Sequence, residues 1–408
     1  MKFMFRSAAG AALLALLPLA SHAIAPDEAS RIEAFLASYS RNVNVVMRTT
    51  NEAGEMISCV DIDRQPGMNH PRARGAVQIQ PSAQLKALLS GAVTAAPASA
   101  LCPTGSVEMR LPTREQIIAR GSLRNFLSKH PNGQGRLPRG NISTPALDGH
   151  YYASVGAEMN AIAAQTTINV WRPGAAFIDF SLSQLWVSGG SGASTQTVEA
   201  GSQVYPQLYG NTQANFFIYF TADNYAQTGC YNLTCPAFVQ TSSVLPIGGV
   251  IGASTFDGYQ VEGTIAFHRD PGTGHWVLLK NNPDGSYTQA GYYPSWVFGG
   301  GPLSRHATRV DFGGEVYTPG GAPPSVPMGS GSHPHYTSPL YGRVAYQRSL
   351  LWMDTAGVIR DYFPQWSSGE PYGSACAYGL TGQVASAPFH PGWGTAFFLG
   401  GPGYRPGC

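Results

Sequence analysis

Charged residues are scarce in this sequence: they make up 12% of its 408 residues, and the formal net charge is +2. So small a charge gives no reason to expect binding to nucleic acid or to an anionic membrane surface. Long apolar runs are also missing, because no segment after the N-terminus has the roughly 20 uncharged apolar residues that span a membrane. Glycine (49), proline (31), tyrosine (20) and phenylalanine (18) are abundant instead. Many turn-forming and aromatic residues with few charges favour an all-β protein.

Several familiar catalytic signatures are missing after residue 140. There is no His-Glu-x-x-His and no Cys-x-x-Cys, so no metal site is expected. A Gly-x-Ser-x-Gly elbow is absent, and residues 189–192 are better interpreted as a hairpin tip than as a phosphate-binding loop, so no cofactor is expected. The glutamates of this part of the chain are few: Glu158, Glu199, Glu262, Glu315 and Glu370.

The first 23 residues have the features of a secretory signal peptide. Lys2 and Arg6 precede an apolar run over residues 8–19, and small residues occupy the cleavage positions at 21–23. The apolar run is too short to span a membrane as a helix. We therefore expect a secreted protein, exported to the extracellular space or to a bacterial periplasm.

Six cysteines in an exported chain indicate disulfide bonds. Proximity in the sequence favours the pairs Cys59–Cys102, Cys230–Cys235 and Cys376–Cys408, although other pairings are formally possible. The first pair falls within the N-terminal region, and the third would fix the C-terminus.

Residues 24–140 differ in pattern from the rest of the chain. Apolar residues with helical spacing around Ile32 and Tyr39 predict an amphipathic helix, and Thr113 with Gln116 forms a possible capping box for a second helix. A polar run rich in glycine and proline then begins at Lys129, which predicts an exposed, cleavable linker near residues 129–145. We interpret the region as a small α/β propeptide that inhibits the domain following it; the alternative is an ordinary N-terminal domain.

Strand patterns recur from His150 onwards, separated by turns rich in Gly, Pro, Asn and Asp. Helical patterns are rare, and no internal repeat is visible. We therefore predict one catalytic domain over residues 146–408, built as an antiparallel β-sandwich of two stacked, jelly-roll-like sheets, and acting as a monomer. The predicted strands cover residues 165–171, 177–187, 195–205, 215–221, 258–268, 275–280, 304–317, 342–353 and 396–399.

Two of these predicted strands carry a glutamate among glycines and aromatic residues. Alternation places Glu199, Gln203 and Tyr205 on one face of the first strand, and Glu315 and Tyr317 on one face of the other. Such a pair suits peptide hydrolysis, since one carboxylate can activate water while the other protonates the leaving amine. Two close carboxyl groups share a proton most readily in acid.

Other residues complete or compete with this predicted pair. Gln184, Gln203 or a tyrosine hydroxyl could stabilise the oxyanion that forms during hydrolysis. Glu262 is the main rival to Glu199 and Glu315, because it too lies in a predicted strand beside a glycine.

Four segments of the chain resemble the neprosin family of secreted glutamic endopeptidases: residues 180–187 (FSLSQLWV), 198–210 (VEAGSQVYPQLYG), 229–235 (GCYNLTC) and 313–316 (GGEV). The resemblance runs from about His150 to the C-terminus, and more weakly over residues 101–126, which are similar to the family's activation peptide. It implies a β-sandwich, a catalytic pair at Glu199 and Glu315, and cleavage after proline at acid pH.

Two departures from the family pattern concern the subsites. The Gly-Trp pair common after the first glutamate is Gly201-Ser202 here, and residues 325–341 and the tail after Cys376 match poorly. We expect a proline pocket with aromatic walls from Tyr205, Tyr317 and Trp186, and therefore proline-rich protein and peptide substrates.

Two other classes of function remain open from the sequence. A pair of carboxylates on a jelly roll also suits a glycoside hydrolase. A non-catalytic carbohydrate-binding sandwich would use Trp186, Trp276 or Trp296 as a stacking platform.

Overall fold

The computed structural model describes residues 25–79, 101–129, 149–282, 286–320, 325–362, 377–381 and 392–405. The predicted signal peptide, the Cys376–Cys408 pair and most of the predicted linker lie outside these residues. Within them, no helix is long and apolar enough to cross a membrane.

The N-terminal unit, residues 25–129, is a small α/β structure. Thr113 caps α3 in the predicted capping box with Gln116, and Cys59 is bonded to Cys102. The single helix predicted to start at Thr113 is in fact two short helices, because the chain turns at Gly121 with φ 81° and Ser122 caps the second one. The elements are α1 (Pro26–Ser40), β1 (Val45–Thr50), β2 (Met56–Asp61), η1 (Pro66–Met68), β3 (Ser106–Met109), α3 (Arg114–Ala119) and α4 (Leu123–Leu127).

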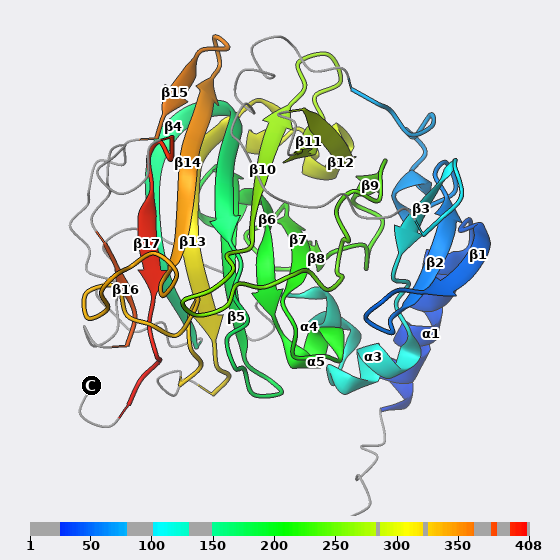
Figure 1. Ribbon diagram of the computed structural model, residues 1–408. Helices are drawn as coiled ribbons and strands as arrows, with labels where there is room; N and C mark the ends of the chain where they lie inside the picture. Colours follow the sequence, from blue (N-terminus) through cyan, green and yellow to red (C-terminus); the bar gives the residue numbers. More distant parts are fainter. Residues whose placement is uncertain are drawn as a thin grey trace, which may run out of the picture.

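The rest of the described chain forms an antiparallel sheet of 14 strands (Figure 1). The strands run in the order β8-β7-β6-β5-β13-β4-β10-β11-β12-β9, while β14 pairs with β4 and carries β15 and β17. Their bounds are β4 (His150–Asn169), β5 (Phe180–Gly189), β6 (Gln196–Val204), β7 (Asn215–Thr221), β8 (Cys230–Tyr231), β9 (Val239–Gln240), β10 (Glu262–Arg269), β11 (Trp276–Asn281), β12 (Tyr287–Tyr293), β13 (Ala307–Tyr317), β14 (Ala345–Asp354), β15 (Ile359–Asp361), β16 (Gly379–Leu380) and β17 (Phe397–Gly400). Short helical turns connect them: η2 (Gly192–Ser194), α5 (Pro206–Tyr209), η3 (Ser295–Phe298) and η4 (Pro302–Ser304).

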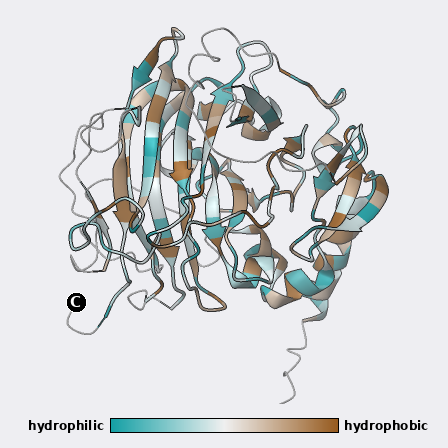
Figure 2. Cartoon of the chain, in the orientation of Figure 1, coloured by the Kyte–Doolittle hydropathy of each residue, from teal (hydrophilic) through white to brown (hydrophobic). Residues whose placement is uncertain are grey.

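The predicted antiparallel β class is confirmed, with its two layers joined by hydrogen bonds into one curled sheet. The long strand β4 makes the connection, because its first part pairs with β13 and its later part with β10 and β14. The sheet has two arms, one from β5 to β8 and the other from β10 to β12. The hydrophobic core includes Leu185 and Ile218 from the first arm and Ile265 and Leu278 from the second. Hydrophobic and hydrophilic residues are interspersed along the strands, as alternation between core and surface requires (Figure 2).

Two substantial strands escaped the sequence analysis, the first half of β4 and all of β12. Residues 150–164 are rich in alanine, which has a weak preference for strands, so their local pattern is poor. Pairing with β13 fixes this half of β4 instead. The strand is therefore set by its neighbour in the sheet, which local propensity does not report.

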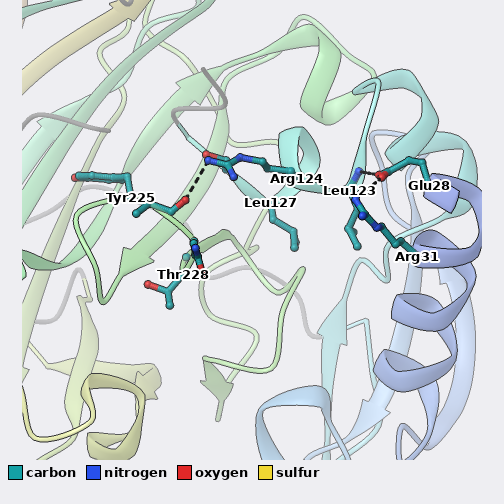
Figure 3. Close-up of a pocket in the computed structure, with 11 residues that line it drawn as sticks. Glu28, Arg31, Leu123, Arg124, Leu127, Tyr225 and Thr228 are labelled. Atoms are coloured by element: carbon teal, nitrogen blue, oxygen red, sulfur yellow. Dashed lines mark hydrogen bonds and ion pairs between the residues drawn. The ribbon is translucent and has the colours of Figure 1, made fainter. Parts of the chain in front are cut away.

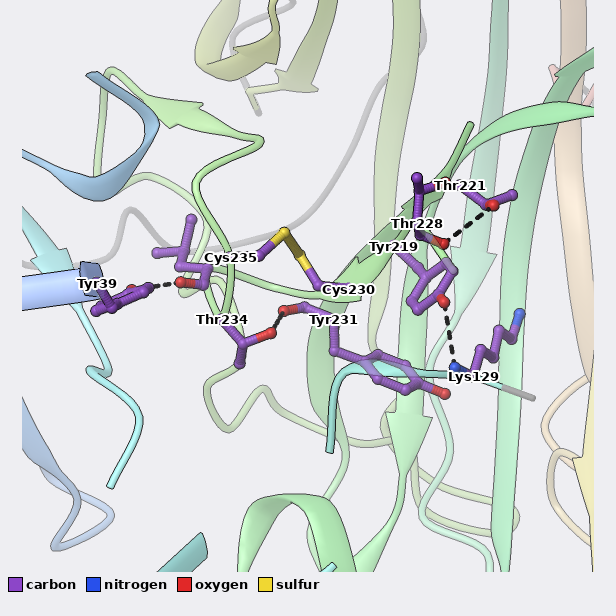
Figure 4. Close-up of a disulfide and its surroundings, with 10 residues drawn as sticks. Tyr39, Lys129, Tyr219, Thr221, Thr228, Cys230, Tyr231, Thr234 and Cys235 are labelled. Carbon is purple, nitrogen blue, oxygen red and sulfur yellow. Dashed lines mark hydrogen bonds between the residues drawn. A yellow bond between two sulfur atoms is a disulfide. The ribbon is translucent and has the colours of Figure 1, made fainter. Parts of the chain in front are cut away.

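The N-terminal unit packs against the outer face of β5, β6 and β7. Its residues Ile32, Ile117 and Phe126 join a buried cluster with aromatic residues of that face, among them Tyr205 and Phe217. The Tyr39 hydroxyl donates to the Leu233 carbonyl in the loop that the Cys230–Cys235 disulfide closes (Figure 4). The face that carries Glu199 is therefore covered.

Candidate active site

The fold brings Glu199 and Glu315 together although 116 positions separate them in the chain. Glu199 lies on β6 and Glu315 on β13, with β5 between them. Both side chains are fully buried, and both contact the ammonium group of Lys129. The Nζ–Oε2 distances are 2.7 Å to Glu199 and 2.8 Å to Glu315. The two carboxylates are thus close enough for one small donor to bridge them.

The glycines near both glutamates include two that flank Gln184. Gln184 on β5 lies opposite Gly201 on β6 and Gly313 on β13. A Cβ at Gly201 would lie 2.0 Å from the Ser183 carbonyl oxygen, and one at Gly313 would lie 2.3 Å from that of Ala153. No side chain can therefore occupy either position, so neither β6 nor β13 presents a side chain directly beside Gln184.

The amide of Gln184 faces the pair. Its Nε2 donates to Oε2 of Glu315 at 3.3 Å. Its Oε1 is buried and has no hydrogen-bond partner among the described residues. A buried polar atom without a partner costs free energy, which is tolerated most often at functional sites.

Hydroxyl groups hold Glu199. Oε1 of Glu199 accepts hydrogen bonds from Thr197 Oγ1 at 2.8 Å and from the Tyr225 hydroxyl at 2.6 Å. Burial raises the pKa of Tyr225 well above its usual value, with the charge of Glu199 adding to the effect, so this tyrosine stays a hydroxyl. Tyr225 has φ 62° and its neighbour Asn224 φ 57°, a costly conformation for residues other than glycine.

The loop that carries Tyr225 is stabilised by its own side chains. Thr221 Oγ1 accepts from the Tyr225 N–H at 2.8 Å, and the Asp223 carboxylate accepts from the N–H groups of Ala226, Gln227 and Thr228. The hydrogen bonds to Thr228 and Gln227 lower the pKa of Asp223 despite its partial burial. The strained backbone is thus held in place on the Glu199 side of the pair.

A histidine holds Glu315. Nδ1 of His150, the first residue of β4, lies 2.7 Å from Glu315 Oε1, and both side chains are buried. The imidazole packs against Tyr317, with 4.4 Å between ring centroids, and its edge faces Phe180 at 5.6 Å. Glu315 is therefore bonded to nitrogen groups, whereas Glu199 is bonded to hydroxyls and to Lys129.

The prediction that an exposed linker begins at Lys129 is wrong for this residue, because Lys129 is buried. Its side chain is 1% exposed, and its Nζ lies 5.6 Å from the centre of the Trp186 ring. Its backbone N–H donates to the Tyr219 hydroxyl at 3.2 Å (Figure 4). Burial lowers the pKa of Lys129, but attraction to Glu199 and Glu315 outweighs it, so the pKa is raised and the ammonium stays charged.

The junction of the N-terminal unit with the sheet is open on one side. A pocket of about 290 Å³ lies between α1, α4 and the loop that carries Tyr225 (Figure 3). Arg124 donates to the Ala226 carbonyl at 3.2 Å, and Glu28 accepts from the Leu123 N–H at 2.7 Å. Solvent therefore reaches this part of the junction, next to the loop that holds Glu199.

The remaining predicted site residues share the face but differ in their contacts. Gln203 donates to the Tyr231 hydroxyl at 3.4 Å and accepts from Tyr209 at 2.9 Å, and no described contact joins it to either glutamate. Tyr317 packs on His150, beside Glu315. Tyr205 contacts Arg120 of the N-terminal unit and not the pair.

The rival glutamates have structural partners. Glu262 forms an ion pair with Arg348 of β14 and accepts from the Tyr346 hydroxyl at 2.9 Å. Glu158 is exposed and lies 3.1 Å from Arg309. Glu370 lies outside the described residues.

The tryptophans do not form the exposed platform that a carbohydrate-binding module would need. Trp276 and Trp186 are buried, and Trp276 donates from Nε1 to the Leu303 carbonyl at 2.8 Å. Trp296 stacks on His70 of the N-terminal unit, with 4.9 Å between ring centroids. Among the described residues, no group of three or more His, Cys, Asp or Glu side chains could hold a metal ion.

Buried carboxylates that share one small donor are an arrangement suited to an acid–base hydrolase. The sequence also matches the model of the neprosin family over residues 178–402, which is more than half of the chain. The protein belongs to the neprosin family. Membership supports a peptidase of the glutamic type, acting on proteins or peptides.

Solved structures of glutamic peptidases are distantly similar. Scytalido-glutamic peptidase with a transition-state analogue inhibitor is 11% identical, with a TM-score of 0.35 over 61% of this chain and 97% of its own. SCP-B, a member of the eqolisin family of peptidases in complex with the tripeptide Ala-Ile-His, is 8% identical, with a TM-score of 0.28 over 62% of this chain and 96% of its own. The family assignment rests on the sequence match.

Proposed function

We propose that this protein is a secreted glutamic endopeptidase that is made as an inactive precursor and cleaves mainly after proline at acid pH. The observation that carries the proposal is the shared contact of Glu199 and Glu315 with one nitrogen atom, Nζ of Lys129. A water molecule at the position of that nitrogen would lie within hydrogen-bonding distance of both carboxylates. This is the geometry that water activation by a pair of carboxylates requires.

The chemistry uses the two glutamates as a base and an acid. The ionised carboxylate takes a proton from water, which attacks the carbonyl carbon of the substrate, and the protonated carboxyl then donates its proton to the leaving amine. In this proposal the Gln184 amide, which donates to Glu315, stabilises the oxyanion. His150 and Tyr225 orient the glutamates through hydrogen bonds to their second oxygens.

The N-terminal unit acts as the inhibitory propeptide in this proposal. Lys129 occupies the position of the reacting water, and Phe126 and Ile117 cover the aromatic face beside it. Activation then requires cleavage after Lys129, so that it can leave, and before His150, so that Glu315 keeps its partner. The new N-terminus is expected between residues 130 and 150.

The proline preference is supported by aromatic side chains near the pair. Trp186 and Tyr317 lie beside the glutamates, and Tyr317 packs on Phe180, with 5.4 Å between ring centroids. Tyr205, the third wall expected from the sequence, contacts Arg120 instead. Proline has no N–H to satisfy, so a pocket for it needs shape and aromatic walls and no charged partner. Such a pocket discriminates moderately, and we expect slower cleavage after alanine.

A proteome digest tests this function. Secreted protein would be incubated with denatured proteins at about pH 3–5, the range in which carboxyl groups titrate, and the new C-termini would be read by mass spectrometry. We expect strong enrichment of proline at the new C-termini, and no new termini with the Glu315→Gln variant. Cleavage without proline enrichment would refute the specificity alone, whereas no cleavage by the processed wild-type protein would refute the peptidase.

A further inference from the structure

A second cation of the N-terminal unit, Arg120, is buried on the same face as Lys129. Arg120 is 5% exposed. One terminal nitrogen of its guanidinium donates to the Tyr205 hydroxyl and, at 2.7 Å, to Oε1 of Gln207. The guanidinium carbon also lies 4.6 Å from the centre of the Tyr205 ring. The other two nitrogens donate to the Asn125 carbonyl of the N-terminal unit, at 2.8 and 3.2 Å.

The half of this site that belongs to the sheet is rich in acceptors. Tyr205 follows β6, Gln207 lies on α5, and Asp179 directly precedes β5. Burial raises the pKa of Tyr205, while Arg120 lowers it and Asp179 raises it, so both charges act on the same hydroxyl. If the N-terminal unit leaves, Arg120 leaves with it, and an aromatic ring, an amide oxygen and a hydroxyl remain.

The position of this site relative to the glutamate pair follows from the strand register. Tyr317 pairs with Phe180, and Glu315 pairs with Leu182. Tyr205 packs on Phe180, so it belongs to the row of Phe180 and Tyr317. That row lies two residues along the strands from the row of Glu315, which is about 7 Å. A peptide that places its reacting bond at the pair can therefore reach Tyr205 within a few residues.

This inference rests on the proposed function, because it requires the N-terminal unit to give way to a substrate. We propose that Tyr205 and Gln207 form a subsite for a basic side chain of the substrate, arginine above all, and that Arg120 fills this subsite in the precursor. A substrate guanidinium stacks on the Tyr205 ring and donates to the Tyr205 hydroxyl and Gln207 oxygen as Arg120 does. Arginine suits the site better than lysine, since its planar group can stack and donate at the same time.

The test uses the processed enzyme and matched peptides. Each peptide carries one proline at P1 and, at a single position between P4 and P4′ other than P1, either arginine or its neutral isostere citrulline. We expect one position at which arginine raises kcat/KM about fivefold or more over citrulline, roughly the effect of one cation–π contact with a hydrogen bond. The gain should come from a lower KM, because the contact is made equally in the ground state and the transition state.

Variants of Gln207 test whether the substrate arginine binds at the proposed subsite. Gln207→Lys should bring the arginine-to-citrulline ratio to about one or below, through charge repulsion, and Gln207→Glu should raise the ratio, through charge attraction. Gln213 lies in the same connection between β6 and β7 and contacts Arg172, away from Arg120. Gln213→Lys and Gln213→Glu add the same charges there, and the ratio should stay at its wild-type value.

The outcomes separate the subsite from the peptidase. If no peptide is cleaved, the proposed function fails and the subsite with it. If the peptides are cleaved with ratios within twofold at every position, the subsite is refuted and the peptidase stands. An arginine-to-citrulline ratio that is high and unchanged in both Gln207 variants would also overturn the proposal, because the guanidinium would then be bound elsewhere.

Discussion

Glu315 and Glu262 have similar local sequences but cations of different origin. Each lies on a strand next to a glycine. Glu262 is paired with Arg348, which belongs to the same sheet. Glu315 is paired with Lys129, which belongs to the N-terminal unit and is shared with Glu199. The local sequence pattern therefore does not distinguish a structural carboxylate from a candidate catalytic one. The two differ in whether the paired cation belongs to the sheet or to the N-terminal unit.

The two pairings also differ in energetic consequence. Buried charges are costly unless they are paired, and removing one partner leaves the other without compensation. Loss of Arg348 would therefore damage the sheet. Loss of Lys129 is different, because it leaves two carboxylates that can share one proton. Of the ion pairs between described residues, only those of Lys129 join the N-terminal unit to the sheet. Lys129 is thus a removable partner of the two glutamates, since it leaves if the N-terminal unit leaves.

The largest expected effect separates the two kinds of glutamate. Glu199→Gln and Glu315→Gln should each lower kcat by about 10³-fold or more, and the double variant should be little worse, since the pair acts as one unit. Glu262→Gln should keep most of the activity but lower the free energy of unfolding by about 3 kcal/mol. Activity is measured on a proline-containing peptide after cleavage at a protease site introduced into residues 130–148, and stability by urea unfolding. More than a tenth of wild-type activity in either single variant would contradict the assignment.

The next effect concerns the removable partner. The raised pKa of Lys129 means that its contribution is present at every pH below the unfolded value near 10.4 and is lost only as pH rises through the folded value. Acidification therefore does not weaken the contact by changing the charge of Lys129. Lys129→Met removes the contact at every pH, so the variant precursor should show activity at neutral pH, where we expect the wild-type precursor to be inactive.

Lys280→Met is the matched control for this variant. Lys280 is a half-buried lysine of β11 that donates to the Val244 carbonyl, and no ion pair of it with the glutamates is described. Its variant should stay latent at neutral pH and shorten in acid, with a new N-terminus between residues 130 and 150 by N-terminal sequencing. Equal latency of the Lys129→Met and wild-type precursors at all pH values would show that covering of the face, and not the charge contact, keeps the precursor inactive.

The smallest expected effect lies on the arm of the sheet that carries Glu262. Burial lowers the pKa of His268 on β10 to about 4, and its Nδ1 has no hydrogen-bond partner among the described residues. The folded pKa lies below the unfolded value of about 6.5, so stability is complete above pH 6.5 and falls as pH drops towards 4. His268→Gln should reduce this acid-dependent loss by up to about 3 kcal/mol, as measured by urea unfolding at pH 7 and pH 4. His306→Gln, at a partly exposed histidine, is the control; an equal gain in both variants would rule out burial as the cause.

Much of the fold was predictable because its signals are local. The capping box of Thr113, the short loop of Cys230–Cys235 and the continuous aromatic and apolar run of β7 all arise within a few residues. The glycines at 201 and 313 also marked the right strands, because the backbone of a neighbouring strand leaves no room for a side chain at either position. The first half of β4 was missed since its pairing partner, and not its composition, makes it a strand.

The sequence by itself determined the β class, the N-terminal α/β unit and the two strands that carry Glu199 and Glu315, because side-chain periodicity is a property of neighbouring residues. Only the tertiary structure decided which groups meet these carboxylates. Lys129 stands at the start of a polar run and His150 at the start of a strand, and neither position has a local pattern that marks it as a partner. Their contacts exist because the N-terminal unit packs on one face of the sheet and because β4 pairs with β13. Both depend on burial and strand pairing between residues far apart in the chain, which no local pattern encodes.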